Sequence, residues 1–352
     1  MNLNDAKRTT IDHLMKQIGP HLNPSDVTEV AIVQPGELWQ RRFSGWQRVE
    51  APALTTKFLN SLSTALAVYN DQIPAPLQYV LMPDGERATI AKPPALLDGT
   101  YGVAFRKRSV TVKTIEQLNQ EHAFADTVDV SLNRPTEAEI DALLRATDLS
   151  RIDTREAELL SLKAEGNYVD FLRKCVQYKR NIVITGKTGS GKTTLARTLI
   201  ELVPSSERII TVEDVHELVL PNHANKLHMI FGDKPGQVTA TECLHACMRL
   251  SPDRIFLAEL RGNETWDYVN SLNTGHPGAI TTVHANNARH TFERIAMLIK
   301  VTPVGQGLDI ETVRNTLNQT IDVVVFMDQR KVLEIFYDPI FSRGTTVQRR
   351  TV

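Results

Sequence analysis

The sequence predicts an α/β protein in which a smaller α+β domain precedes a C-terminal domain built on a parallel-type sheet. From about residue 168 to the end, apolar β-branched runs alternate with stretches of helical spacing, which is typical of a parallel sheet covered on both faces. Before about residue 110, short alternating runs are separated by turn residues, which is typical of strands and hairpins. With 352 residues, of which 41% are hydrophobic and 23% charged, the chain is long enough for two domains.

The N-terminal domain, residues 1–110, is expected to combine several strands with one main helix. A short amphipathic piece is expected at Leu14–Ile18. Trp39 and Trp46 fall on neighbouring expected strands, and we interpret them as a cross-strand core pair rather than a ligand platform. The expected strands are 27–33, 37–42, 46–49, 78–81, 87–91 and 101–105, with the helix at about 55–69.

Residues 111–167 are expected to form a helical linker between the domains. Thr136 and Glu139 have the spacing of a capping box, and the residues after them place apolar side chains on a single helix face. A second helix is expected at 155–163. Such a segment can pack on its own subunit or on a neighbouring one, and the sequence leaves both open.

The C-terminal domain, residues 168–352, is expected to carry the chemistry. Ligands of parallel sheets gather at the carboxyl ends of the strands, so the residues just past those ends are the candidates. The expected strands are 181–185, 208–212, 254–258, 279–283 and 321–327, with helices between them.

Composition and charge exclude several function classes. Forty basic and forty-one acidic side chains leave a formal net charge of −1, which argues against a protein whose main task is to neutralise nucleic-acid phosphates. No sequence-specific nucleic-acid binding is expected. No apolar run approaches the length of a membrane span, and the N-terminus does not have the pattern of a signal peptide. We therefore expect a cytosolic protein, or one peripheral to a membrane.

The three cysteines, Cys175, Cys243 and Cys247, are too few for a disulfide framework, which fits a reducing compartment. Cys243 and Cys247 could be half of a zinc site, but no second cysteine pair follows them. They also share one face of a helix that begins with a capping box at Thr239 and Glu242. Core packing is the interpretation we favour.

Residues 186–193 read G-K-T-G-S-G-K-T, an unbroken G-x-x-x-x-G-K-[ST] phosphate loop between an expected strand and an expected helix. Its glycines permit positive φ and bring backbone N–H groups against phosphate oxygens at the positive end of the helix. A chance glycine-rich turn would lack the strand, lysine and threonine in register. The residues expected to bind a nucleoside triphosphate are Gly186, Lys187, Thr188, Gly189, Ser190, Gly191, Lys192, Thr193 and Thr194.

Two residues of this loop have separate expected roles. The Lys192 ammonium is expected to reach the β and γ phosphates. The Thr193 hydroxyl is expected to bind Mg²⁺, which bridges those phosphates and neutralises charge as the terminal P–O bond breaks.

Carboxylates follow two of the expected strands. Glu213 and Asp214 come after the second strand, where they could order waters around Mg²⁺ or belong to a solvated loop. Glu259 ends the third strand and is the best-placed candidate for the base or water-orienting group that hydrolysis needs. Arg261 could be its ion-pair partner, which would also serve a purely structural carboxylate.

Two histidines bracket the fourth strand. A histidine at a strand end is usually a core residue, but His284 lies at the carboxyl end, where it could donate a hydrogen bond to the γ phosphate. His276 is expected to shape the loop from Gly275 to Gly278.

These four blocks, in this order, resemble the secretion ATPase superfamily: phosphate loop, acidic Asp box, Walker B ending in Glu, and His box. Within that superfamily the chain is most similar to the hexameric traffic ATPases of type IV secretion and conjugation systems. The resemblance covers nearly the whole chain. The stretches that point to this branch are Gln34–Trp39, Cys243–Arg254 and Thr274–His276.

The resemblance implies a RecA-like C-terminal domain and a two-domain subunit that forms stacked homo-oligomeric rings, with ATP bound between the domains. It also implies work at the cytoplasmic face of the inner membrane, with membrane components of a secretion machine as partners. The implied catalytic residues are Lys192, Glu213, Glu259 and His284, with Thr193 and Glu213 at Mg²⁺, partly through water. Two features depart from the family pattern, namely Ala258, where glycine is usual, and the long segment 109–167.

An arginine from the N-terminal domain is also implied at the γ phosphate. Arg106 matches best, although Arg108 lies close by and a solvated basic turn is the alternative.

Three other functions compete with a type IV secretion motor that drives apparatus assembly and the transfer of DNA or protein. A type IV pilus or type II secretion motor would share the catalytic core, although the type II assembly branch commonly carries a tetracysteine metal module that three cysteines cannot build. A nucleotide-dependent binding switch would need no base at the triphosphate. A signalling GTPase is disfavoured because Asn225–His228 fails the N-K-x-D pattern at its last position.

Overall fold

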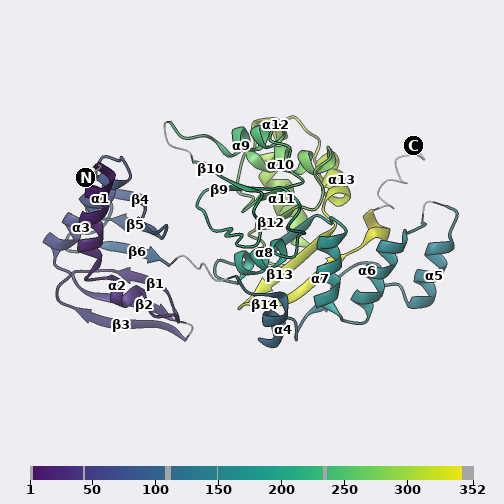
Figure 1. The fold of residues 1–352 in the computed structure, drawn as a ribbon, viewed down its shortest axis with the longest axis horizontal. Coiled ribbons are helices and arrows are strands. Elements are labelled where there is room, and N and C mark those ends of the chain that lie inside the picture. Colours follow the sequence, from purple (N-terminus) through teal and green to yellow (C-terminus); the bar gives the residue numbers. More distant parts are fainter. Residues whose placement is uncertain (1–2, 43, 108–111, 149, 233–235, 343–352) are drawn as a thin grey trace. The chain divides into compact units, whose positions relative to one another are not determined.

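The computed structural model describes residues 3–42, 44–107, 112–148, 150–232 and 236–342 (Figure 1). The chain divides into two compact units, Met1–Ser109 and Val110–Val352, which are described in turn.

The first unit is a six-stranded antiparallel sheet with helices. Its strands run in the order β3-β2-β1-β6-β5-β4. Their bounds are β1 Val27–Ile32, β2 Gly36–Arg42, β3 Gly45–Ala51, β4 Leu77–Leu81, β5 Arg87–Ala91 and β6 Gly102–Arg106. The helices are α1 Leu3–Met15, α2 Gly19–Leu22 and α3 Thr56–Tyr69. Alternate strand residues such as Val103 and Phe105 join the side chains of α3 in one apolar core.

Two expectations for this unit are wrong. A helix covers Leu3–Met15, whereas only a short piece around Leu14–Ile18 was expected. Trp46 is not half of a core pair, because it is 45% exposed and lies opposite Arg41 in the β2–β3 register. Its ring lies 5.6 Å from the Arg41 guanidinium carbon, so this exposed aromatic packs against a cation instead.

The second unit is a mostly parallel sheet between two layers of helices (Figure 1). One part of the sheet has the order β10-β9-β11 and the other β12-β8-β13-β14-β7. The Leu260 amide donates to the Thr282 carbonyl at 2.8 Å, which links the two parts beside β11 and β12. The strands are β7 Val128–Asp129, β8 Ile182–Gly186, β9 Ile209–Glu213, β10 Lys226–Ile230, β11 Arg254–Leu257, β12 Ile280–Val283, β13 Val323–Asp328 and β14 Lys331–Tyr337.

Side-chain alternation along the buried strands builds a core on each face of this sheet. Ile182 and Ile184 pack with helices α4 to α8 and their connections, whereas Val183 between them packs with α9, α10, α11 and α13. The helices are α4 Ile115–Gln120, α5 Glu137–Arg145, α6 Thr154–Ala164, α7 Tyr168–Gln177, α8 Lys192–Ile200, α9 Ala240–Cys247, α10 Glu264–Asn273, α11 His290–Lys300, α12 Pro303–Gln306 and α13 Ile310–Thr320.

The five strands expected in this unit are present, and β7, β10 and β14 are additional. β14 runs antiparallel to β13, so the sheet is mixed at this end. Both predicted capping boxes form, at Thr136 with Glu139 and at Thr239 with Glu242. The three cysteines are buried free thiols, as core packing requires.

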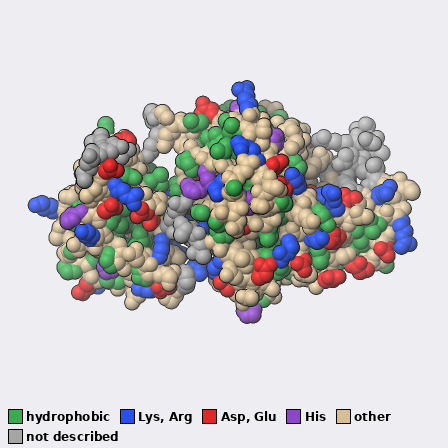
Figure 2. Space-filling model, in the orientation of Figure 1, with side chains coloured by type: hydrophobic (Ala, Val, Ile, Leu, Met, Phe, Trp, Pro, Cys, Tyr) green, Lys and Arg blue, Asp and Glu red, His purple; other side chains and the backbone are tan. Residues whose placement is uncertain are grey.

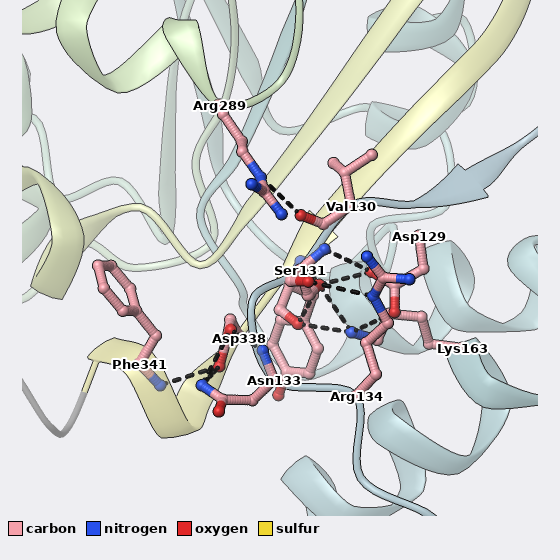
Figure 3. A network of polar contacts seen from close by, with 10 residues as sticks. Asp129, Val130, Ser131, Asn133, Arg134, Lys163, Arg289, Asp338 and Phe341 are labelled. Carbon is pink, nitrogen blue, oxygen red and sulfur yellow. Dashed lines mark hydrogen bonds and ion pairs between the residues drawn. The ribbon is translucent and has the colours of Figure 1, made fainter.

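A buried lysine joins the helical segment to the end of β14 (Figure 3). The Lys163 side chain extends from α6, is 3% exposed, and places its ammonium 3.0 Å from the Asp129 carboxylate. It also donates to Ser131 Oγ and to the Tyr337 carbonyl, each at 2.8 Å. Burial lowers the pKa of Lys163, and the Asp129 charge acts against that shift. This segment is therefore packed into the core of its own unit.

Candidate active site

The phosphate loop joins β8 to α8, and its three glycines have positive φ: +147° at Gly186, +79° at Gly189 and +103° at Gly191. At Gly186, a Cβ atom would lie 2.1 Å from the Met327 carbonyl oxygen, so only glycine fits there. Gly191 precedes α8 without a side-chain cap, which leaves the N–H groups of the first helical turn directed at the loop. The local backbone therefore forms an anion-binding cradle.

Lys192 lies across this cradle. Its side chain is buried, and its ammonium donates to the carbonyls of Gly186 at 2.8 Å and Lys187 at 2.9 Å. Within the part of the chain that the structure describes, the buried Ser190 hydroxyl has no hydrogen-bond partner. A polar atom buried without a partner is costly unless a ligand satisfies it, so this observation fits a phosphate oxygen in the loop.

The rest of the loop is more open to solvent. Lys187, Thr188 and Gly189 are exposed, while Thr193 and Thr194 are half-buried in the first turn of α8. Thr193 is therefore placed to offer its hydroxyl to a cation bound beside the phosphates.

Glu259 follows β11 and has a polar partner on each side, an ion pair with Arg261 and a hydrogen bond with His284. One carboxylate oxygen lies 2.6 Å from an Arg261 guanidinium nitrogen, and the other lies 3.0 Å from His284 Nε2. Arg261 uses its second terminal nitrogen on Asp214 at 2.6 Å, so it bridges the ends of β9 and β11. Ala258, where glycine is usual, keeps the strand pairing, because its amide donates to the Val212 carbonyl at 3.0 Å.

His284 follows β12 and connects this carboxylate to the phosphate loop. Burial, followed by the charge of Lys192, lowers the pKa of His284, so its ring is neutral at neutral pH. Nδ1 lies 3.4 Å from the Lys192 ammonium and Nε2 lies 3.0 Å from Glu259. With its proton on Nε2, the ring donates to Glu259 and accepts from Lys192 at Nδ1; with its proton on Nδ1, it donates to the Gly186 carbonyl at 3.1 Å.

Glu213 lies apart from this chain of contacts. Its side chain is completely buried at the end of β9, where the amides of Glu217 and Leu218 each donate to Oε2 at 2.7 Å. Thr211 donates to the other oxygen at 2.7 Å. Burial alone would raise the pKa of Glu213, but the hydrogen bonds from His228, these amides and Thr211 outweigh it and lower the pKa to about 2.

The structure thus brings Lys192, His284, Glu259, Arg261 and Asp214 into one continuous set of contacts. Arg106 ends β6 in the first unit, where its side chain is exposed, and Arg108 lies outside the described residues. His276 is half-buried between Gly275 and Gly278, both of which have positive φ. The role predicted for Glu213 at Mg²⁺ stays a prediction.

The sequence interpretation missed the support that the β13–β14 turn gives the phosphate loop. The Arg330 amide donates to the Ser190 carbonyl at 2.9 Å, and Gln329 and Arg330 have φ of 47° and 66°. The polar run Asp328–Lys331 between two apolar stretches was the available signal for a hairpin turn. Among the helices that the structure describes, none combines the length and the apolar character of a membrane span.

Comparison with known proteins gives the family. The model of the family described as "Type II/IV secretion system protein" matches residues 122–333, which is more than half of the chain. The type IV secretion system protein VirB11 of Brucella abortus is 36% identical over 357 residues, which cover 97% of this chain and 94% of the relative.

Solved structures agree with this result and confirm the predicted α/β fold class with its RecA-like C-terminal domain. The VirB11 ATPase from the Brucella suis type IV secretion system, solved with sulphate, is 36% identical with a TM-score of 0.53, over 98% of this chain and 99% of that one. The pilus retraction motor PilT is 18% identical with a TM-score of 0.55, over 97% of this chain and 88% of that one, and shows the shared fold alone. The chain therefore belongs to the type II/IV secretion system protein family, as a VirB11-type ATPase of type IV secretion.

Proposed function

We propose that this chain hydrolyses ATP with Mg²⁺ at the phosphate loop, and that the resulting motion drives apparatus assembly and substrate transfer in a type IV secretion machine. The observation that carries the proposal is the run of contacts from Lys192 through His284 to Glu259. It joins the group that would hold the phosphate to the group that would direct the attacking water.

The phosphate loop supplies binding and charge. On arrival of the triphosphate, the Lys192 ammonium exchanges the Gly186 and Lys187 carbonyls for phosphate oxygens, and the Ser190 hydroxyl gains the partner it lacks among the described residues. Thr193 would hold Mg²⁺, which neutralises the charge that develops on the phosphate oxygens. Because α8 points its N-terminus at the same place, its partial positive charge acts in the same direction.

Glu259 is the proposed base or water-orienting residue. Arg261 and His284 hold its two oxygens, which fixes the direction of the carboxylate before the substrate arrives. Because His284 contacts both Lys192 and Glu259, movement of the lysine onto phosphate alters the contacts around the base. This gives the site a physical means of sensing the γ phosphate.

Two predicted residues act from further away in this proposal. Arg106 of the first unit would complete the charge at the γ phosphate. Glu213 would hold the 213–218 loop, and with it the neighbouring Asp214 that orients Arg261. A water-mediated Mg²⁺ contact from Glu213 remains part of the proposal.

We further propose that the chain assembles into a homo-oligomeric, hexameric ring, peripheral to the cytoplasmic face of the inner membrane and docked on membrane components of the secretion machine. The family membership and the resemblance of the motifs support this assembly. Sedimentation with and without ATP tests it: a ring-sized species is expected, and a monomer under all nucleotide conditions contradicts it.

Phosphate release from ATP by the purified full chain tests the enzymatic proposal. Turnover is expected with Mg²⁺ and not after its removal by chelation, and Lys192→Ala should abolish it. Lys57→Ala, at an exposed lysine of α3 outside the proposed site, is the matched control that should retain turnover. Binding of ATP without turnover, in the presence and absence of membrane partners, would favour the nucleotide-dependent binding switch instead.

A further inference from the structure

Three potential metal ligands converge beside the carboxyl end of β9: Glu213 ends that strand, His216 lies in the loop after it, and His228 lies in the middle of the neighbouring β10. Nδ1 of His216 lies 3.1 Å from Glu213 Oε1, and Nδ1 of His228 lies 3.5 Å from the same oxygen. The three ligand atoms all lie within 4.8 Å of one another. The histidine rings lie side by side, with centroids 4.2 Å apart.

The two distances from Glu213 Oε1 are close to the separation of two ligands in a zinc coordination shell. Ligands bound tetrahedrally at about 2.0–2.1 Å lie roughly 3.3 Å from each other. We propose that Glu213, His216 and His228 form a binding site for a divalent transition-metal ion, with Zn²⁺ as the expected ion and water as the fourth ligand. One carboxylate and two imidazoles are a donor set that zinc uses in proteins.

The surrounding structure holds the ligands in place. The Glu213 carboxylate is fixed by the Glu217 and Leu218 amides at Oε2, and its Oε1, which accepts from the Thr211 hydroxyl at 2.7 Å, faces the histidines. His228 is fixed by the parallel register of β10 with β9, in which it lies opposite Thr211. Its Nδ1 also lies 2.8 Å from the Thr211 hydroxyl. A site with ligands held in this way needs little rearrangement to bind an ion.

Solvent reaches the cluster from the side of its two histidines. The side chains of His216 and His228 are 34% and 21% exposed, whereas that of Glu213 is 0% exposed. An ion can therefore reach the two imidazoles from solvent and meet the carboxylate behind them. Imidazole nitrogen favours zinc and its neighbours over magnesium, so the two histidines distinguish this site from the Mg²⁺ site proposed at Thr193, with which it shares only Glu213, there through water.

The test is a calorimetric titration in which Zn²⁺ is added to the full chain. The chain is first stripped of metal with a chelator, and the buffer contains excess Mg²⁺. One ion per chain is expected to bind at this site and to raise the melting temperature. His216→Ala and His228→Ala should each weaken this binding at least about tenfold. The matched control is His245→Ala, because His245 is an exposed histidine on α9 outside the cluster.

Absence of Zn²⁺ binding, or binding that both cluster variants leave unchanged, overturns the proposal. If a variant fails to fold by circular dichroism, labelling of the wild-type chain with diethyl pyrocarbonate decides instead. Zn²⁺ should protect His216 and not His245, and equal labelling of His216 with and without Zn²⁺ overturns the proposal. Neither experiment depends on ATP turnover, so its failure is distinguishable from failure of the proposed function.

Discussion

Of the lysines that the structure describes in the second unit, Lys163 and Lys192 are buried, and their surroundings differ. Lys163 meets the Asp129 carboxylate at 3.0 Å and donates to Ser131 and to the Tyr337 carbonyl, so its three protons face three fixed acceptors (Figure 3). Lys192 lies against carbonyls of its own loop, beside a buried hydroxyl that lacks a partner among the described residues. We call the Lys163 network closed, because the three protons of its ammonium face three fixed acceptors. We call the Lys192 network open, because it is arranged to exchange its contacts for those of a ligand.

The difference shows that burial of a charged group does not by itself indicate function. A closed network holds two segments together, here the stretch after β7 and the end of β14. An open network borders exposed residues, as the phosphate loop does at Lys187, Thr188 and Gly189. On the face drawn in Figure 2, acidic and basic side chains are interspersed. What surrounds a buried charge therefore indicates its role better than its depth.

Replacing each of the two lysines with methionine is expected to give the largest difference between the two networks. Lys192→Met should lower ATP turnover at least about a thousandfold with little loss of stability, because it removes charge at the transferred phosphate. Lys163→Met should lower the free energy of unfolding by about 3–5 kcal/mol, because the Asp129 carboxylate loses its partner, while the folded fraction keeps its turnover. Urea unfolding and phosphate release on both variants provide the measurement. Equal effects of the two changes on turnover would contradict the distinction.

Arg106→Ala tests whether a residue of the first unit contributes to the site around Lys192. If this arginine completes the γ-phosphate site, its loss should cost on the order of a thousandfold in turnover. Arg41→Ala is the control, because Arg41 is an exposed arginine of the same sheet that packs on Trp46. Steady-state phosphate release distinguishes the two, and an unchanged rate in Arg106→Ala removes this residue from the site.

Arg261→Lys tests whether the direction of the Glu259 carboxylate depends on the two contacts of Arg261. A lysine keeps the charge but cannot bridge Asp214 and Glu259 with two nitrogens, so the carboxylate loses its fixed direction. Turnover should fall on the order of a hundredfold with KM nearly unchanged. A rise in KM at constant kcat would instead indicate a role in binding. Arg314→Lys, in a surface ion pair with Glu293, is the control.

Glu213 is held by fixed hydrogen bonds beside the open site, so in the metal-free chain its ionisation affects stability. Its pKa of about 2 in the fold lies below the ordinary value of 4.5, so its ionised form stabilises the folded state above about pH 4.5. That contribution, on the order of 3 kcal/mol, is lost as the pH falls toward about 2. Urea unfolding across this range measures it. Glu213→Gln should flatten this part of the profile, and an unaltered profile would contradict the assignment.

Much of the fold follows from the sequence because apolar periodicity is strong in the buried strands. Runs such as Ile182–Gly186 are buried on both faces, so their continuous apolar sequence predicts a strand clearly. β10 was missed because it is an edge strand whose side chains are exposed or half-buried, Lys226 among them. β14 lies between β13 and β7 and is largely buried, so its run Val332–Tyr337 carried a strand signal that the sequence interpretation did not use. Exposed edge strands give weaker signals than central ones.

Sequence motifs identified the candidate site residues, whereas most of the contacts among them depend on the fold. The loop, Glu259 and His284 follow from placement after strands, and the Arg261 pairing with Glu259 was anticipated. The second contact of Arg261, with Asp214, joins residues 47 positions apart and depends on which strands are neighbours. The hydrogen bonds that close around Glu213 depend on the backbone path of the 213–218 loop, which local patterns do not specify.

The most direct test of the proposed chemistry is a single measurement on Glu259→Gln, with Glu293→Gln as a surface control. The full chain is loaded with radiolabelled ATP and Mg²⁺, and bound ATP and released phosphate are followed together. The amide should retain ATP binding and lower phosphate release by about a hundred- to ten-thousandfold, because it can neither accept a proton nor orient water as a carboxylate does. Phosphate release at the wild-type rate by ATP-bound Glu259→Gln would contradict the role of this residue and the mechanism built on it.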